Sequence, residues 1–315
     1  MRIRDKIKKP QRPVVAYEIL PPREKDGTLN SYAETISSLL SQTHIDAINI
    51  PEVHDEVGRG DRPVVNQKRG EPREFGMLLQ DIVGIEAIIN RVVVHDPYDR
   101  QMKWLEETNT KYEIENMIIV GGESSKVSYP GPTVNEALKA ITDKYNQNGG
   151  NIFCGGIAIP SRKEESKNLI KKSDNGSEFF TTQVLYDSKN IIKMINNYQQ
   201  RCDELDTFPR RILLSFAPVS SQKNVEFLKW LGVEIPDDTE KYLQARPGSM
   251  TERSLDVSIE VLNEILNYIQ ENDLRVPVGL NVEHIMSYNF QSSVEMLQEL
   301  ARIYREFCIK AQHYS

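Results

Sequence analysis

The sequence predicts an α/β protein built as one (β/α)8 TIM barrel. Short apolar runs rich in β-branched residues alternate along the chain with longer amphipathic stretches of helical periodicity. The short runs are continuously apolar rather than alternating, as expected for strands that are buried on both faces. The 315 residues suit one large barrel, and no GxGxxG, the usual sign of the rival doubly wound sheet, follows the first run.

Each predicted strand is followed in the sequence by helical periodicity or a connecting segment. The strands are expected, in chain order, at Val14–Ile19, Ala47–Ile50, Ile89–Val94, Met117–Val120, Ile152–Ala158, Phe179–Leu185, Ile212–Phe216 and Pro277–Val282. Helices are expected at Ser31–Ser41, Phe75–Ile88, Thr133–Tyr145, Lys163–Lys172, Lys189–Leu205, Asn224–Leu231, Leu255–Ile269 and Ser293–Phe307. No repeat or Pro/Ser-rich linker divides the chain, which predicts one barrel domain over residues 1–315.

Three segments do not belong to this alternation. The basic segment 1–12 is expected to be a solvated tail or a short helix. Two connections, Glu52–Glu74 and Gly232–Arg253, are longer than most loops of compact domains, and such loops are often functional. We expect Glu52–Glu74 to cover the site as a lid.

Composition narrows the function classes. Lys and Arg number 39 against 46 Asp and Glu, and a net charge of -7 argues against a general nucleic-acid partner. The three cysteines lie far apart, which suits a reducing compartment without a disulfide framework. The sequence has no CxxC or HExxH, so no metal site is expected. It has no apolar run of membrane-spanning length and no secretory h-region, so we expect a cytoplasmic protein without a membrane partner; a homo-oligomer is compatible with these features.

The ends of the predicted strands carry the candidate catalytic residues, because the chemistry of such barrels lies at the C-terminal mouth. Glu18 lies inside the apolar run VVAYEILPPRE, where an unpaired carboxylate is unfavourable. Glu123 enters from another strand, and two carboxylates in different environments can divide into an acid and an anion. Gly121 and Gly122 lack side chains and would let a flat ligand approach, and Gln183 lies in a buried strand. A structural ion pair at Glu18 and an ordinary turn at the glycines are the alternatives.

Other candidates follow strands 5 and 8. Asn168, Lys171 and Lys172 cluster toward the end of one predicted helix, where a solvent-exposed lysine pair is the common alternative. Ile159 ends strand 5, and Asn281 lies in strand 8, which continues into Glu283 and His284.

Five stretches resemble, in order, the methylenetetrahydrofolate reductase family: AYEILPPRE, VGGESS, NLIKKSDNGSEFFTTQVLYD, FAPVSSQKNVEFLKWLGVEIPDD and VGLNVEHIMSY. The resemblance runs from about Val14 to Arg302. It implies a flavin-dependent barrel enzyme of one-carbon metabolism that converts 5,10-methylenetetrahydrofolate, or a close C1-pterin, to the 5-methyl form. Reduced FAD would deliver the hydride, and NADH or NADPH would reduce the flavin.

The resemblance also implies residue roles. Glu18 would be the general acid that protonates N10 and opens the ring, and the apolar neighbours of Glu18 would raise its pKa. Gln183 would orient the pterin, Glu123 would contact pterin and flavin, and Asn281 would line the shared folate and nicotinamide site. Flavin contacts are implied for Gly121, Gly122, Ile159, Asn168, Lys171 and Lys172.

Departures from the family pattern gather on the flavin side. Strand 2 ends in Asn-Ile-Pro-Glu, residues 49–52, instead of a glycine-rich turn, and Arg91 stands near the usual histidine of strand 3. Gly121 replaces an arginine, Glu123 an aspartate and Ile159 a tyrosine. A flavin-free pterin reductase and a non-reductase pterin-binding barrel beside a methyltransferase are therefore the alternatives. An unrelated barrel lyase would need a Schiff-base lysine in a strand, and the predicted strands contain none.

Overall fold

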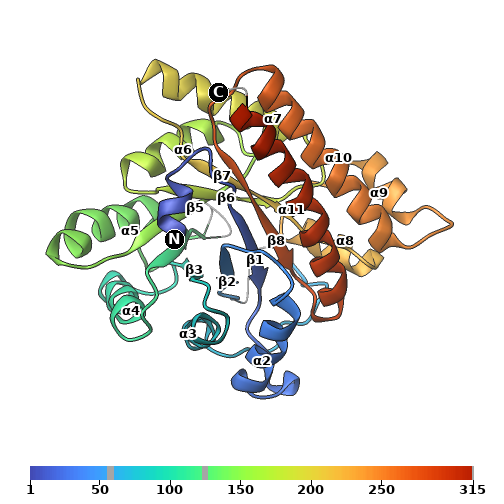
Figure 1. The fold of residues 1–315 in the computed structure, drawn as a ribbon. Coiled ribbons are helices and arrows are strands. Elements are labelled where there is room, and N and C mark those ends of the chain that lie inside the picture. Colours follow the sequence, from blue (N-terminus) through green and yellow to red (C-terminus); the bar gives the residue numbers. More distant parts are fainter. Residues whose placement is uncertain (55–59, 123–126, 314–315) are drawn as a thin grey trace.

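The strands form a closed parallel barrel in the order β1-β2-β3-β4-β5-β6-β7-β8, and helices surround it (Figure 1). The computed structural model describes residues 1–54, 60–122 and 127–313. The predicted single (β/α)8 barrel is confirmed. No helix in these described ranges combines the length and the apolar character that crossing a bilayer requires.

The elements follow one another as the sequence alternation predicts. The strands are β1 Val15–Ile19, β2 Ala47–Pro51, β3 Ala87–Val92, β4 Asn116–Val120, β5 Phe153–Ala158, β6 Phe179–Val184, β7 Arg211–Phe216 and β8 Val278–His284. The helices are α1 Ile3–Ile7, α2 Leu29–Leu40, α3 Pro72–Val83, α4 Tyr98–Thr110, α5 Val134–Ala140, α6 Glu165–Asp174, α7 Lys189–Glu204, α8 Gln222–Trp230, α9 Asp237–Gln244, α10 Met250–Glu271 and α11 Phe290–His313. Short 3-10 helices lie at Glu24–Asp26, Asn146–Asn148 and Ser287–Asn289, and a short π-helix lies at Ile141–Tyr145.

The expected helix Phe75–Ile88 is wrong at its end. Helix α3 stops at Val83 because Gly84 adopts a left-handed conformation with φ 70°, which caps the helix. The chain then enters β3 at Ala87, before the predicted start at Ile89. The β-branched residues near this boundary fit both the helical and the strand periodicity. Gly84 is the residue that marks where the helix ends and the approach to β3 begins.

Two helices were not expected. Helix α4 follows β3 and buries a narrow face that includes the polar side chains of Gln101 and Thr108 beside Leu105, so its apolar periodicity is weak. Helix α9 lies inside Gly232–Arg253, which is therefore not an extended loop. Its first turn carries three acidic residues, which stabilise a helix N-terminus.

The barrel interior changes character from one end to the other. Near the N-terminal ends of the strands it is apolar, filled by Val14, Ala16, Ala47, Ile88, Ile118, Phe153, Phe179 and Leu213. Two residues further along the strands, polar residues follow at the alternating positions, including Glu18, Asn49, Asn90, Thr181, Ser215 and Asn281. This alternation places a polar layer at the mouth above an apolar floor.

The basic segment 1–12 closes the floor of the barrel. Ile3 and Ile7 of α1 are 1% and 3% exposed and join the apolar interior cluster. The buried guanidinium of Arg211, in β7, donates to the Ile7 carbonyl oxygen at 3.2 Å and to the Lys9 carbonyl oxygen at 2.6 Å. The expected short helix is present, but the segment is not a solvated tail.

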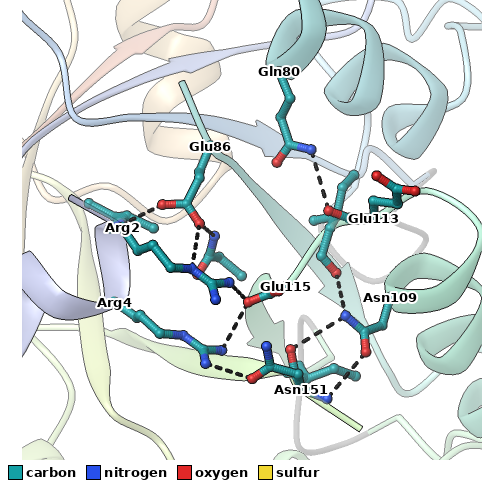
Figure 2. Close-up of polar contacts among 12 residues, drawn as sticks. Arg2, Arg4, Gln80, Glu86, Asn109, Glu113, Glu115 and Asn151 are labelled. Atoms are coloured by element: carbon teal, nitrogen blue, oxygen red, sulfur yellow. Dashed lines mark hydrogen bonds and ion pairs between the residues drawn. The ribbon is translucent and has the colours of Figure 1, made fainter. Parts of the chain in front are cut away.

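Charged residues of the same segment pair with residues that immediately precede the strands (Figure 2). Arg2 forms ion pairs with Glu86 and Glu115, and Arg4 contacts Glu115 at 3.3 Å. Arg4 also donates to the Asn151 side chain at 2.6 Å. Two further ion pairs, Lys6–Asp46 and Lys8–Glu178, complete the attachment. The positive charge of the segment therefore matches acidic residues at the strand starts.

Candidate active site

A cavity of about 1030 Å³ occupies the C-terminal mouth of the barrel. Its lining includes six of the predicted site residues: Glu18, Gly121, Gly122, Ile159, Lys172 and Gln183. Asn281 is fully buried directly beneath Glu18, whereas Asn168 and Lys171 lie outside the lining. The predicted residue Glu123 falls outside the described residues. The mouth therefore brings together Glu18, Gln183 and four of the six residues that were predicted to contact flavin.

Glu18 points inward from β1 and is held by two amides. The Nδ2 atoms of Asn49 and Asn281 donate to Glu18 Oε2 at 2.6 and 3.2 Å. The part of Glu18 that remains exposed faces the cavity. Enclosure by protein raises the pKa of Glu18 to about 7, although the Asn281 hydrogen bond acts in the opposite direction. A carboxyl with this pKa carries a transferable proton near neutral pH.

A second carboxyl, Glu283, lies beside Glu18. The two residues are register partners across the β1–β8 pair, which closes the barrel. Burial raises the pKa of Glu283 well above its ordinary range, and the charge of Glu18 raises it further. In the described part of the chain no cation contributes to the pKa of either carboxyl, which argues against the structural ion pair considered for Glu18.

Sequence reasoning did not assign Glu283 a role. The available signal was the alternation in strand 8, which puts Asn281 and Glu283 on one face. The paired acid that we expected, Glu123, lies outside the described residues, and the carboxyl that the structure places beside Glu18 comes from strand 8.

Gln183 reaches the cavity from β6. Its Nε2 atom donates to the Leu231 carbonyl oxygen at 2.9 Å, which fixes the amide at the wall of the mouth. Its position on the lining is compatible with the predicted contact to a pterin ring.

Of the predicted diphosphate ligands, Asn168 and Lys172 contact a buried carboxylate. Glu165 is 2% exposed, and its oxygens accept from Asn168 Nδ2 at 2.9 Å and contact Lys172 Nζ at 3.4 Å. Arg162 Nη1 lies 3.3 Å from the same carboxylate. Lys172 Nζ also donates to the Ile157 carbonyl oxygen at 2.5 Å, and burial lowers its pKa. Lys171 is exposed, as the alternative reading of this lysine pair anticipated.

A family description named "Methylenetetrahydrofolate reductase" matches residues 2–300 of this sequence. The chain belongs to the methylenetetrahydrofolate reductase family. Methylenetetrahydrofolate reductase 1 of Schizosaccharomyces pombe is 24% identical over 176 residues, which cover 52% of this chain. That match spans 26% of the yeast protein, so the aligned half of this chain corresponds to about a quarter of the length of that relative.

A solved structure with a similar fold is an uncharacterized protein from Clostridium thermocellum that binds two copies of 5-methyl-5,6,7,8-tetrahydrofolic acid. The two chains superpose with a TM-score of 0.77 at 21% identity, covering 96% of this chain and 99% of the other. This likeness supports the fold of the reductase-family barrel.

Two residues that depart from the reductase-family pattern, Glu52 and Arg91, form an ion pair with each other. Arg91 of β3, which is 3% exposed, lies 2.5 Å from Glu52 at the end of β2 and 2.5 Å from Asp96. Its guanidinium also packs 4.4 Å from the ring centre of Trp104. The glutamate that replaces the family's glycine-rich turn therefore neutralises the arginine of the neighbouring strand.

The glycines of the reductase-family strand-4 motif line the cavity, and Gly122 is exposed there. A Cβ atom built on Gly122 would lie 2.3 Å from the ring of Tyr129, so a residue with a side chain would not fit at this position without a shift of that ring. Tyr129 packs edge-on against His95 at 5.6 Å, and His95 packs against His54 at 4.6 Å. These three rings form the wall of the mouth beside the glycines.

These contacts test the fit of FAD, the cofactor of the reductase family. A diphosphate binds well to cations or to free N–H groups. Here Lys172 and Asn168 are engaged with Glu165, whereas Gly121 and Gly122 line the cavity. The arrangement does not fit the diphosphate contacts that were predicted for Lys172 and Asn168. In the described ranges no group of three or more His, Cys, Asp or Glu side chains is arranged to hold a metal ion.

The described part of the loop Glu52–Glu74 lies over the mouth, as predicted. Gly70 N donates to the Pro22 carbonyl oxygen at 2.9 Å on the β1 side. On the α8 side, Trp230 Nε1 donates to the Gly60 carbonyl oxygen at 3.3 Å, and Arg62 packs 5.2 Å from the Trp230 ring. Nine described residues of this loop line the cavity: Glu52, Val53, His54, Arg62, Val64, Val65, Asn66, Gln67 and Arg69.

Proposed function

We propose that this chain binds a reduced folate in the mouth of the barrel and converts 5,10-methylenetetrahydrofolate, or a close C1-pterin, to its 5-methyl form. The observation that carries the proposal is Glu18, a carboxyl with a pKa of about 7 on the wall of a large cavity. Family membership supports a folate substrate, and so does the 5-methyltetrahydrofolate bound by the similar Clostridium protein.

Glu18 would act as the acid that opens the five-membered ring. Its proton passes to N10 while the bond between N10 and the methylene carbon breaks, with the electron pair remaining on N10. The methylene carbon is then an iminium with N5, and a hydride delivered to this carbon completes the methyl group. The proton from Glu18 and the hydride together account for the two added hydrogens. Asn49 and Asn281 hold the acid in place, and Gln183 would contact the pterin ring.

NADH or NADPH would supply the hydride. In the family this electron pair passes through FAD, which remains a prediction for this chain. One observation favours the flavin-free route that the sequence left open: the side chains of Lys172 and Asn168 are engaged with Glu165. On this route the nicotinamide binds in the same mouth as the folate and gives its hydride directly to the iminium carbon.

Absorbance of the purified protein distinguishes the two routes. We expect no flavin spectrum and the same rate of NADH or NADPH oxidation with and without added FAD. If instead the wild type retains flavin, and Lys172→Met loses it while Lys171→Met keeps it, that result would establish the diphosphate site that the sequence predicts.

The reductase proposal is tested by Glu18→Gln, which keeps the shape of the side chain and removes the acid. We expect methylenetetrahydrofolate reduction to fall by about 10² or more while folate binding is retained. Glu271→Gln, at the exposed end of α10, is the matched control and should leave turnover unchanged. Wild-type protein that binds 5-methyltetrahydrofolate but shows no turnover with either nicotinamide would support the non-reductase barrel beside a methyltransferase.

A further inference from the structure

The closing strand of the barrel contributes a second carboxyl to the acid site. Glu283 and Glu18 are register partners on β8 and β1, and both line the cavity. The Nδ2 atom of Asn281 lies 3.2 Å from Glu18 Oε2 and 3.4 Å from Glu283 Oε1. One amide nitrogen therefore holds both carboxyl groups in the same small region.

The surroundings of this carboxyl pair are mostly uncharged. Asn49 faces it from β2, Ser215 from β7 and Asn281 from β8; Ser215 Oγ also accepts from Asn281 at 3.1 Å. Of the titratable neighbours, Tyr186 has a pKa raised by its burial and by Glu283. His284, the next residue of β8, also lines the cavity and packs edge-on against Phe290 at 5.1 Å.

Two adjacent carboxyls in such a setting do not readily ionise together, because each negative charge disfavours the other and neither is well solvated. The two groups titrate as a unit, and the unit keeps its last proton to higher pH than either carboxyl would alone.

We propose that Glu283 is a positioning residue for the proton of Glu18: placed beside the acid by Asn281, it keeps a proton in the pair and available for transfer to the folate ring nitrogen. The proposal rests on the proposed role of Glu18 as the acid. When Glu18 gives its proton to N10, the electrons of the broken bond stay on N10. The carboxyl pair of Glu18 and Glu283 then gains one negative charge. The positive charge that appears on the N5 iminium offsets this added charge.

Infrared difference spectroscopy of the ligand-free protein tests the coupling without any turnover. The difference between wild type and Glu18→Gln identifies the carboxyl band of Glu18. In Glu283→Gln, we expect the remaining carboxyl, Glu18, to ionise at a pH about one unit or more below that at which the wild-type pair loses its last proton, because no like charge remains beside it. The reciprocal measurement, of Glu283 in Glu18→Gln, should show the same downward shift and serves if Glu283→Gln folds poorly. Unchanged titration of the remaining carboxyl in both variants would overturn the proposal.

The pH profile of kcat/KM supplies the functional readout. The alkaline limb of Glu283→Gln should move to lower pH by the same amount as the infrared titration, while Glu271→Gln keeps the wild-type limb. A loss of activity at every pH with no shift of the limb would mean that Glu283 has only a structural role. If Glu18→Gln retains full turnover, the proposed acid role fails, yet the infrared titration still decides whether the two carboxyls are coupled.

Discussion

Glu52 and Arg91 form an ion pair between the ends of neighbouring strands β2 and β3, with Glu52 Oε1 2.5 Å from Arg91 Nη1. Glu52 Oε2 also accepts from the backbone N–H of Val92 at 3.1 Å, and Arg91 Nε donates to Gln101 at 3.1 Å. The carboxylate of Glu52 and the guanidinium of Arg91 therefore neutralise each other at the edge of the site.

Arg91→Met should destabilise the protein by about 3–5 kcal/mol, because it leaves Glu52 and Asp96 close together without their shared cation. Denaturant unfolding measures this change. The double variant Glu52→Gln/Arg91→Met should recover part of the loss, which a double-mutant cycle would report as coupling. Strictly additive effects would show that the two residues are energetically independent.

Glu18→Gln should raise stability at alkaline pH. The pKa of Glu18 is about 7 in the folded protein and near 4.5 in the unfolded chain. Between these values the unfolded chain releases the proton and the folded protein keeps it, so the stability of the wild type falls as pH rises through this window. At pH 8 the variant should gain on the order of 1–3 kcal/mol relative to the wild type, and at pH 4 little. Thermal melts at both pH values measure the difference. A lower melting temperature of the variant at pH 8 would point to a structural ion pair instead.

Ile7→Ala should loosen the floor of the barrel. Ile7 is 3% exposed within the apolar interior cluster, and removal of such a side chain destabilises by about 2–5 kcal/mol. We expect chemical denaturation to show this loss with little change in KM, since the floor lies away from the mouth. Leu39→Ala, at a position 42% exposed, is the control and should change stability far less. Equal effects of the two substitutions would contradict the burial of α1.

Ligand should protect the loop over the mouth. The Lys68 side chain is 86% exposed, which makes the peptide bond after it a suitable trypsin site in this loop. Because neighbouring residues line the cavity, 5-methyltetrahydrofolate should slow cleavage after Lys68, as followed by mass spectrometry. The pterin-free fragment p-aminobenzoylglutamate is the control. Cleavage at the same rate with and without saturating folate would argue that the loop does not close on the ligand.

Sequence reasoning located Glu18 because a carboxyl within a continuous apolar run has few purely structural explanations. Glu283 was missed because its partner lies at the other end of the chain, and only the closure of β8 on β1 makes them neighbours. The same limit applies to Arg2 and Arg4, whose acidic partners Glu86 and Glu115 precede two different strands. Alternation along a strand gives the face of a residue, but the residue it meets depends on the register between strands.

The predicted flavin ligands show a different limit. A motif reports that Lys172 and Gly122 occupy the expected positions, but it does not report what else reaches them. In the structure Glu165 engages the lysine, and the Tyr129 ring lies where a side chain at the glycine position would be. Both neighbours come from segments to which the motif assigns no role.

Segment 1–12 lies beneath an interior that apolar side chains already fill, so in the described part of the chain the barrel is open to ligands at its mouth. In the proposed reaction, folate and hydride donor would both enter and leave through this mouth, beneath residues 60–70. Each product would then have to leave before the next reactant takes its place. High concentrations of one reactant should therefore slow turnover, because that reactant would occupy the mouth before the other reactant or its product has passed.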